Sequence, residues 1–552
     1  MNHALVLPIV IPLVAAAAIV ALPLRAQRLQ RALSVIATLA LVPVAVWLAR
    51  LASSGDVVTY ALGAWPAPFG IVLQLDRLAA LMLLLTAVLA GCCLLGTSSA
   101  DVRRGRYFRA LFQFELMGLN GAFLAGDLFN LFVFFELLLI ASYALLLHGG
   151  GRRRVMSGLR YMLLNLVGSS FFLIAVGVLY GLTGTLNMAD MGVRLAHLDA
   201  ASLPLAQFAG AMLMLVFGVK AAVFPLSFWL PQAYRSAIGP VAALFAIMTK
   251  VGVYAMLRCD ALVFGAAGGI LEGFMHNWAW WLAIATIVFG ALGALAVSSL
   301  KTTTAYLVLV SVGLLIAAAS LQNATAWSAL LYYLISTTLC SAALFLLADT
   351  LEPEAPDPAA AASEPTSHAA LDDTTAPAIS SEPDGETAVA EVAVTAVTAV
   401  VQAVSPARTA TPWPSKAAAL LYLALAVGAA GLPPLSGFLG KAMVLAATPV
   451  AQAVVLWPAV LISGLLLIVA LSRTGTRIFW AVPAAQAFSD EAPPTAPRGT
   501  PAKLAACALL LACVLAVTLS AGPLKHYLDA TAAQLLDRAA YVRAVLNAPE
   551  NG

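Results

Sequence analysis

Ionisable residues inside apolar runs are the most informative feature of this chain, because only 10% of its 552 residues are charged and 62% are hydrophobic. The residues with apolar neighbours on both sides are Glu115, Glu136, Lys220, Lys250 and Lys441. A charge at the centre of a membrane-spanning helix costs about 3 kcal/mol. Each of these residues therefore needs a compensating partner or a hydrated path, which makes it a candidate for function.

Three of these residues are expected at one depth in a membrane. Lys220 lies ten residues before the end of an apolar run at residue 230, and Lys250 lies ten residues after the start of another run at residue 240. At ~1.5 Å of rise per residue, both lie about 15 Å deep, near the midplane. Glu136 lies twelve residues before His148, which places it about 18 Å deep by the same rise. A shared level is what a lateral charge relay requires.

The chemistry that these residue types support is proton transfer. Burial disfavours the charged form of a lysine and a nearby carboxylate favours it, so the distance to Glu136 could switch Lys220 between its two forms. Two neighbouring lysines disfavour double charge, so a proton that reaches Lys250 would weaken the hold of Lys220 on its own proton. The alternative is a static buried ion pair between Glu136 and Lys220, with Lys250 snorkelling to the membrane surface.

Prolines lie close to two of the lysines. Pro225 cannot donate a hydrogen bond to the carbonyl of Ala221, so a free acceptor is expected beside the Lys220 ammonium. An ordinary proline kink is the alternative.

The stretch GAAGLPPLSGFLGKAMVL, residues 428–445, repeats the arrangement. Pro433 and Pro434 are expected to free the carbonyls of Ala429 and Ala430 ahead of Lys441. The surrounding apolar run, 416–446, is longer than the ~20 residues that cross a bilayer, as expected of a helix with an unwound middle. Two broken spans, each with a lysine, suggest an internal repeat built around two half-channels.

Weaker candidates lie in the same part of the chain. Glu115 is either a surface carboxylate or a point at which protons are taken up. Asp76 and Asp127 begin apolar runs and are expected to cap helices. The sixth run contains three polar residues, Asn165, Ser169 and Ser170. They are expected to form hydrogen bonds between helices, and the alternative is that they line a hydrated path.

The elements that must position these residues are membrane-spanning helices. Fourteen apolar runs are expected to span: 4–24, 32–52, 77–97, 109–125, 127–148, 160–182, 207–230, 240–258, 279–299, 303–321, 326–349, 416–446, 454–472 and 503–521. Lys and Arg gather in the connections after odd-numbered runs, such as DVRRGRYFR, HGGGRRRVMSGLR and the connection 473–503. The positive-inside rule therefore predicts that both termini lie outside the cytoplasm.

Two segments fall outside this pattern. Residues 351–415 hold ten acidic residues and one base, Arg408, and are predicted to be a disordered cytoplasmic insert. Residues 523–547 place Leu524, Leu528, Leu535, Val542 and Leu546 on one helical face, which would suit the outer membrane surface. The six cysteines have no metal-ligand spacing, and no nucleotide-binding or haem motif is present, so neither a cofactor nor a metal is expected.

Several long motifs resemble one family. GDLFNLFVFFELLLIASYALLLHGG, GVKAAVFPLSFWLPQAY, MTKVGVYAML and GLPPLSGFLGKAMVL are similar to the antiporter-like subunits shared by respiratory complex I and the multisubunit Mrp cation/proton antiporters. Within that group the chain resembles the Mrp D subunit, and LKTTTAYLVLVSVGLL resembles the Pha-type, potassium-associated branch. The likeness covers all fourteen runs and excludes the insert.

The resemblance implies an all-α polytopic membrane fold with two inverted five-helix repeats and broken helices seven and twelve. Its divisions would be 1–108 (helices 1–3), 109–258 (first repeat), 279–350 with 416–472 (second repeat), the insert 351–415, and 503–552 (helix 14 and an amphipathic tail). It also implies a paired gate of Glu136 and Lys220, a connecting Lys250 and a terminal Lys441. Helix eleven lacks the lysine or histidine of many relatives, so a proton path there would use Ser336, Thr337 or Thr338.

The function that the resemblance implies is transport rather than enzymatic catalysis. The chain would be the D subunit of a multisubunit Na⁺(K⁺)/H⁺ antiporter in a bacterial inner membrane, with other antiporter subunits, protons and a monovalent cation as partners, no nucleic acid, and a role in pH homeostasis. The alternative is a proton-pumping membrane subunit of NADH:quinone oxidoreductase or of a related hydrogenase. The sequence does not choose between Na⁺ and K⁺, because it offers no recognisable coordination cage.

Overall fold

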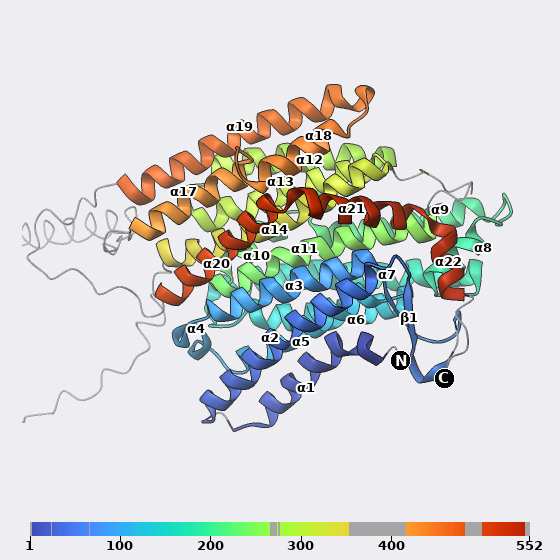
Figure 1. Ribbon diagram of the computed structural model, residues 1–552, viewed down its shortest axis with the longest axis horizontal. Helices are drawn as coiled ribbons and strands as arrows, with labels where there is room; N and C mark the ends of the chain where they lie inside the picture. Colours follow the sequence, from blue (N-terminus) through green and yellow to red (C-terminus); the bar gives the residue numbers. More distant parts are fainter. Residues whose placement is uncertain are drawn as a thin grey trace, which may run out of the picture.

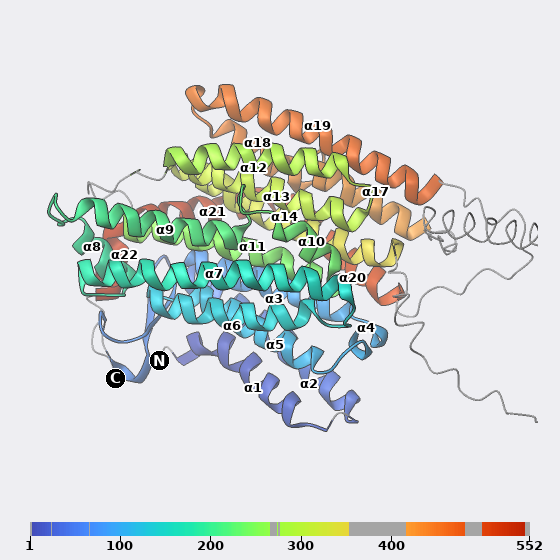
Figure 2. The ribbon, with the colours of Figure 1, turned by 180° about the vertical axis from the view of Figure 1, so that it is seen from behind.

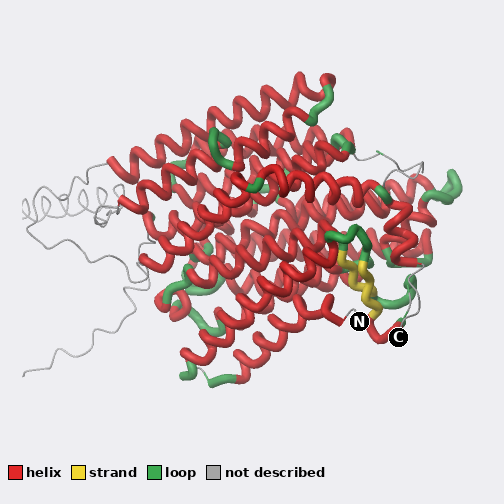
Figure 3. The backbone as a smooth tube through the Cα atoms, in the orientation of Figure 1, coloured by secondary structure: helices red, strands yellow, loops and turns green. Residues whose placement is uncertain are grey.

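A computed structural model describes residues 3–23, 25–65, 67–264, 273, 276–352, 416–480 and 500–546. Most of the described helices run roughly along the long axis of one bundle, and a short hairpin of strands lies at one end (Figures 1 and 3). The predicted insert 351–415 lies outside the described residues except for Leu351 and Glu352, which close a long helix.

The first half of the chain contains η1 (His3–Val6), α1 (Leu7–Ala21), α2 (Gln27–Ala52), β1 (Val58–Ala61), η2 (Leu62–Ala64), β2 (Val72–Leu75), α3 (Arg77–Leu95), α4 (Ser99–Arg103), α5 (Phe108–Leu124), α6 (Leu128–Leu146), α7 (Arg152–Thr183), α8 (Met188–Leu195), α9 (Leu203–Ala221), α10 (Trp229–Ser236), α11 (Gly239–Cys259) and a π-helical turn (Asp260–Phe264). The two strands pair antiparallel, with Val58 opposite Leu75.

The second half contains α12 (His276–Ala296), α13 (Leu300–Ala319), α14 (Ala324–Leu351), α17 (Lys416–Ala430), α18 (Ser436–Ala446), α19 (Val450–Trp480), α20 (Thr500–Leu519), α21 (Ala521–Leu536) and α22 (Arg538–Leu546). Described residues near the two ends of the chain, in η1 and α22, lie at the same end of the bundle in both views (Figures 1 and 2).

The length and composition of these helices are those of membrane spans. Twelve helices among the described residues are long and apolar enough to cross a bilayer. The other two predicted spans correspond to α5, which has 17 residues, and to the pair α17 and α18, which have 15 and 11. The chain is therefore a multi-span membrane protein, and the count of fourteen stays a prediction.

The core of the bundle is formed by a few central helices. α14 and α11 are buried along most of their length, whereas α1, α2, α7, α19 and α20 leave many apolar side chains exposed. Exposed apolar side chains suit contact with lipid, because hydrocarbon is their preferred surroundings. The central helices therefore provide the sheltered positions in which a polar group needs a protein partner.

Two of the predicted spans are interrupted where prolines occur. α9 ends at Ala221, and α10 begins at Trp229, so the predicted span 207–230 is two helices with Pro225 between them. α17 ends at Ala430 and α18 begins at Ser436, with Pro433 and Pro434 between them. A proline lacks the N–H that would continue the helical ladder, which favours both interruptions.

Two predictions near the C-terminus differ from the structure. α19 continues to Trp480, so Arg473 and Arg477, expected in a connection, belong to a helix. Arg477 forms an ion pair with Glu352, which supplies a partner for its charge.

The apolar face of the tail packs on the protein itself. Leu528 and Leu535 are buried, and the Tyr527 hydroxyl donates to Arg77 O (3.2 Å). The Ser328 hydroxyl of α14 donates to Asp529 Oδ1 (2.6 Å). The face expected at the membrane surface thus covers the ends of α3 and α14.

Candidate proton-relay site

Lys220 lies in the last turn of α9, at the first helix break, and its side chain is buried. Its Nζ lies 5.0 Å from the centre of the Phe135 ring of α6, and it has no hydrogen-bond partner among the described residues. A cation near an aromatic face is attracted by the ring quadrupole. The lysine is thus sheltered without being fixed to one acceptor.

Glu136 follows Phe135 on α6 and is half-buried. Its Oε1 accepts a hydrogen bond from the Ser169 hydroxyl of α7. Glu136 and Lys220 do not form an ion pair, so the alternative of a static buried pair does not hold in this conformation. The two groups remain electrostatic neighbours, which is the arrangement that a variable charge pair needs.

The backbone around the first break is held by specific contacts. Ala222 adopts a left-handed conformation (φ 60°), and Val223 N donates to Gly218 O (2.8 Å). The Trp229 indole donates to Val219 O (3.1 Å), and Phe224 N donates to the Thr286 hydroxyl of α12 (3.0 Å). These bonds satisfy backbone groups that the end of the helix leaves open.

The end of α9 packs tightly against α11. A Cβ on Gly252 would lie only 2.6 Å from Ala221 N, so this position in α11 requires glycine. Gly252 follows Lys250 by two residues on the same helix. The close backbone approach therefore brings the break beside Lys220 and the helix of Lys250 together.

Lys250 is fully buried in α11. Its Nζ donates to the Ser311 hydroxyl of α13 (3.0 Å) and to Thr249 Oγ1 (3.3 Å). The snorkelling alternative is therefore wrong, because the side chain does not reach the surface. Sequence reasoning missed Ser311, although a hydroxyl inside an apolar run was the available signal.

Lys441 lies in α18, after the second break, and is also buried. Its Nζ donates to Ala430 O (2.7 Å), one of the two carbonyls that the prolines are expected to free. Gly431, at φ 81°, permits this contact because a Cβ there would lie 2.7 Å from the ammonium. The second break thus supplies an acceptor for its lysine.

The polar residues of α14 divide by what their hydroxyls contact. Ser336 Oγ lies 2.8 Å from Ser436 Oγ, at the start of α18, so it faces the second break. Thr338 donates to Leu334 O of its own helix (2.7 Å), and Thr337 is half-buried. Of the three, only Ser336 has a hydroxyl contact with the broken helix.

Glu115 of α5 is fully buried, so its interpretation as a surface carboxylate is wrong. Neither carboxyl oxygen has a hydrogen-bond partner among the described residues. Ionising a buried carboxyl without a donor is costly. This environment favours a group that carries its proton in the resting conformation.

The remaining polar residues have mainly structural contacts. Asp76 accepts from Ala79 N (2.8 Å) and Asp127 from Asn130 N (2.6 Å), so both cap helices as expected. In α7, Ser169 bonds another helix, but the Asn165 amide and the Ser170 hydroxyl donate to carbonyls of α7 itself. The prediction of interhelical bonding is confirmed for Ser169 and wrong for the other two.

Arg258, at the end of α11, is a buried charge that sequence reasoning missed. Its Nη2 donates to Asp76 Oδ1 (2.8 Å) and to the Tyr254 hydroxyl (3.0 Å), and Nη1 also pairs with Asp76. A buried ion pair with these additional hydrogen bonds is stable, and it fixes α11 against α3. Its signal in the sequence was an acidic residue and a basic residue at the ends of two predicted spans.

A second charged cluster joins helices far apart in the sequence. Lys503 of α20 contacts Asp349 Oδ2 (2.6 Å) in α14 and Asp101 Oδ2 (3.1 Å) in α4. Lys301 of α13 lies 3.7 Å from Asp349 Oδ1 and donates to Ala237 O, directly after α10. The cluster therefore connects the end of the first broken helix to the last span.

Known proteins share this arrangement of helices and motifs. Residues 125–357 match the family described as NADH:quinone oxidoreductase/Mrp antiporter, TM. The D subunit of a probable K⁺/H⁺ antiporter from Rhizobium meliloti is 39% identical over all of this chain and 99% of its own length. The D subunit of the Na⁺/H⁺ antiporter from Alkalihalophilus pseudofirmus is 30% identical over 99% of this chain and 100% of its own length.

The fold has a counterpart among solved structures. A chain in the structure of the Mrp complex from Dietzia sp. DQ12-45-1b superposes with a TM-score of 0.78, covers 99% of this chain and all of its own length, and is 24% identical. At that identity the likeness concerns the fold, while the full-length sequence matches carry the assignment. The chain belongs to the NADH:quinone oxidoreductase/Mrp antiporter family, within its antiporter D subunits.

Proposed function

We propose that this chain is the D subunit of a multisubunit antiporter that exchanges protons for Na⁺ or K⁺ across a bacterial cytoplasmic membrane, with both termini outside the cytoplasm. The observation that carries the proposal is a set of three buried lysines without an ion-pair partner among the described residues, two of them at helix breaks: Lys220, Lys250 and Lys441. Buried lysines change protonation state readily, and a broken helix has room to move when they do.

In the proposed mechanism, protons pass between side chains within the bundle. Glu136 and Lys220 form the variable pair at the first break, Lys250 passes the charge toward the second repeat, and Lys441 ends the path. Glu115 takes up the proton, and Ser336 with Thr337 and Thr338 lines the path near the second break. Pro225, Pro433 and Pro434 keep both helices broken, which gives Lys441 a carbonyl partner and leaves the backbone beside Lys220 free to rearrange.

The central test uses Lys220→Ala and Glu136→Ala in the complete antiporter gene cluster. Everted membrane vesicles are energised, and a pH-sensitive dye reports proton movement after addition of NaCl or KCl. Both variants are expected to lose cation-dependent proton flux, because each removes one half of the variable pair. Flux at the full rate in both variants would rule out the relay.

Two controls make the result specific. Lys525→Ala removes a lysine whose ion pair with Asp529 is exposed, and it should leave the flux unchanged. A native gel shows whether each variant still enters the complex. Comparing NaCl with KCl in the same vesicles identifies the exchanged cation.

The alternative, a redox-driven proton pump, predicts a different energy requirement. An antiporter exchanges ions whenever a proton gradient exists, whether respiration or ATP hydrolysis produces it. A pump subunit moves protons only when an electron donor is supplied. Cation-dependent flux in vesicles energised by ATP alone therefore supports the antiporter, and its absence there supports the pump.

A further inference from the structure

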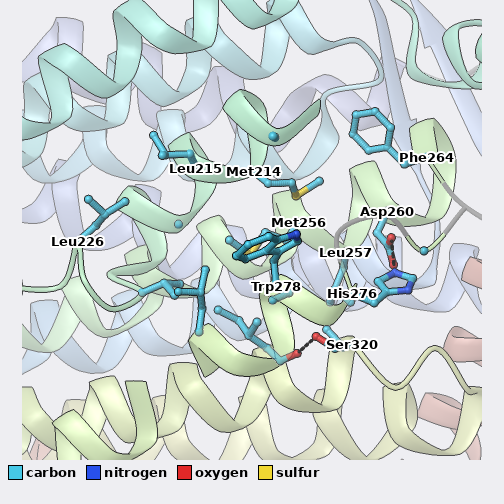
Figure 4. Close-up of a pocket in the computed structure, with 18 of the residues that line it drawn as sticks. Met214, Leu215, Leu226, Met256, Leu257, Asp260, Phe264, His276, Trp278 and Ser320 are labelled. Carbon is cyan, nitrogen blue, oxygen red and sulfur yellow. Dashed lines mark hydrogen bonds and ion pairs between the residues drawn. The ribbon is translucent and has the colours of Figure 1, made fainter. Parts of the chain in front are cut away.

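An apolar cavity of about 690 Å³ lies between α9, α11, α12 and α13 (Figure 4). It is a feature separate from the proposed proton relay. Its lining is almost entirely hydrophobic, with Met214 and Leu215 from α9, Met256 from α11 and Trp278 from α12. The rim side chains Phe208, Leu215 and Trp278 are exposed on the outer surface of the bundle. The cavity thus opens sideways, toward the hydrocarbon of the bilayer.

The depth of the cavity matches one leaflet. Its lining follows α9 from Pro204 to Gly218, which is about 21 Å at the helical rise of ~1.5 Å per residue. One leaflet of a bilayer, with its headgroup region, is about 20–22 Å thick. The inner end of the cavity is closed by Val223, Phe224, Pro225 and Leu226, in the break that follows Lys220.

The other end of the cavity is polar and contains one carboxylate. Asp260 and His276 line it and point toward one another in Figure 4, with His276 Nε2 3.0 Å from Asp260 Oδ1. The Gln322 amide donates to Asp260 Oδ2 (2.9 Å). No lysine or arginine is among the described lining residues. This end therefore favours a cationic group over an anionic one.

We propose that the cavity binds one phosphatidylethanolamine molecule, with its ammonium at the Asp260 carboxylate and one acyl chain along α9. The volume lies within the range of pockets that bind ligands, and an apolar hollow open to hydrocarbon is stabilised when a chain fills it. A helix of another subunit is a poorer occupant, because it would cross both leaflets, whereas the cavity stops at the break.

Lipid at this site would contact moving parts of the bundle. The methyl end of the acyl chain reaches the segment Val223–Leu226, which joins the two halves of the first broken helix. Phe224 of that segment is also bonded to Thr286 of α12, on the opposite wall. A bound lipid therefore limits the space in which the break can rearrange.

The test is photolabelling of the purified complex in phosphatidylcholine vesicles. The probe is phosphatidylethanolamine with a diazirine at the end of one acyl chain, and labelled peptides are identified by mass spectrometry. Label is expected on peptides that contain Met214, Met256 or Val223–Leu226. Ala211→Trp fills the cavity from α9, so an acyl chain can enter only by displacing the ring. The label should fall about tenfold, because the cost of overpacking is about the free energy that corresponds to a tenfold change in affinity.

Matched variants and a second probe decide the outcome. Leu205→Trp adds the same ring to α9 outside the lining and should label like the wild type. Phosphatidylglycerol with the same diazirine should label the wild type less, and Asp260→Asn should remove the difference. If Ala211→Trp fails to assemble, Ala279→Trp fills the cavity from α12 instead.

Three results would overturn the proposal. One is label that neither tryptophan in the cavity lowers. Another is equal labelling of the wild type by both probes. The third is crosslinking of a benzoylphenylalanine at Phe208 to another subunit, which would show that protein covers the cavity.

Discussion

The three buried lysines of the proposed relay differ in what their ammonium groups contact. Lys220 faces an aromatic ring, Lys250 donates to two hydroxyls, and Lys441 donates to a carbonyl that the second break leaves open. A hydrogen bond to a charged group stabilises it by about 1.5–3 kcal/mol. Lys220 is the one of the three without such a bond among the described residues, so its charged form depends most on its neighbour Glu136.

Ser311→Ala tests the hydroxyl that holds Lys250. The substitution removes the acceptor on α13 and leaves only Thr249 Oγ1 at 3.3 Å. Loss of a bond to a charged group changes its proton affinity by about 1.5 kcal/mol or more, so antiport should slow by about tenfold. The dye assay in everted vesicles measures the rate. Thr304→Ala is the matched control, because that hydroxyl bonds Leu300 O within α13; equal slowing in both variants would contradict a specific role for Ser311.

His148, which lies just after α6, gives a pH dependence of stability. Burial lowers the pKa of this imidazole, and the neighbouring charges of Arg154 and Arg104 lower it further, although the bond to Asp101 O opposes them. The unfolded chain therefore binds more protons below the ordinary value of 6.5 than the folded chain does. Stability should be insensitive to this group above about pH 6.5 and fall as the pH decreases below it.

The measurement is the melting temperature of the detergent-solubilised complex between neutral pH and mildly acid pH. His148→Gln retains a donor for Asp101 O but removes the titration. The wild type should lose more melting temperature on acidification than the variant does. An identical loss in both proteins would exclude His148 as the cause.

At the scale of elements, both breaks combine prolines with contacts that fix the surrounding backbone. The first break is anchored through Trp229, Phe224 and Ala237, and the second through the pair Ser336 and Ser436. Each anchor comes from, or leads to, a different helix. Movement at a break therefore has to alter the packing of its neighbours, which is how one repeat can influence the other.

Lys503→Met tests the charged cluster that connects these elements. Lys503 contacts the buried carboxylate of Asp101 and the partly exposed carboxylate of Asp349. Removing one partner of a buried ion pair costs about 3–5 kcal/mol. Here Asp101 loses the ammonium beside it, whereas Asp349 keeps Lys301. The melting temperature of the complex should fall markedly.

Lys525→Met is the comparison for this substitution. The side chains of its ion pair with Asp529 are 42% and 43% exposed, so the change should cost at most about 1 kcal/mol. If the two substitutions lowered the melting temperature equally, the cluster would not contribute more than a surface pair.

At the scale of the whole molecule, periodicity and proline placement predicted most spans and the position of both breaks, because long apolar runs have few alternatives to a helix in a membrane. Side-chain partners were less predictable. Ser311 meets Lys250 only after distant helices pack, whereas the contact of Lys441 with Ala430 O follows from the nearby prolines. Arg258 lies at the end of a predicted span where a surface position was equally plausible. The apolar face of the tail, residues 523–547, was recognisable. The sequence alone could not decide whether that face contacts the rest of the protein or the membrane.

The orientation of the whole bundle can be tested with single cysteines. Asp56 lies in the connection between α2 and β1, Arg106 lies between α4 and α5, and both are exposed. β1 and α4 lie at opposite ends of the bundle (Figures 1 and 2). By the positive-inside rule the connection with Arg106 faces the cytoplasm.

A membrane-impermeant maleimide added to intact cells should therefore label Asp56→Cys fully, and Arg106→Cys only after permeabilisation. Five native cysteines are buried and Cys513 is partly so, and the wild-type chain gives the background. The reverse pattern would place the described ends of the chain, in η1 and α22, on the cytoplasmic side and would reverse the direction in which protons meet Lys220 and Lys250.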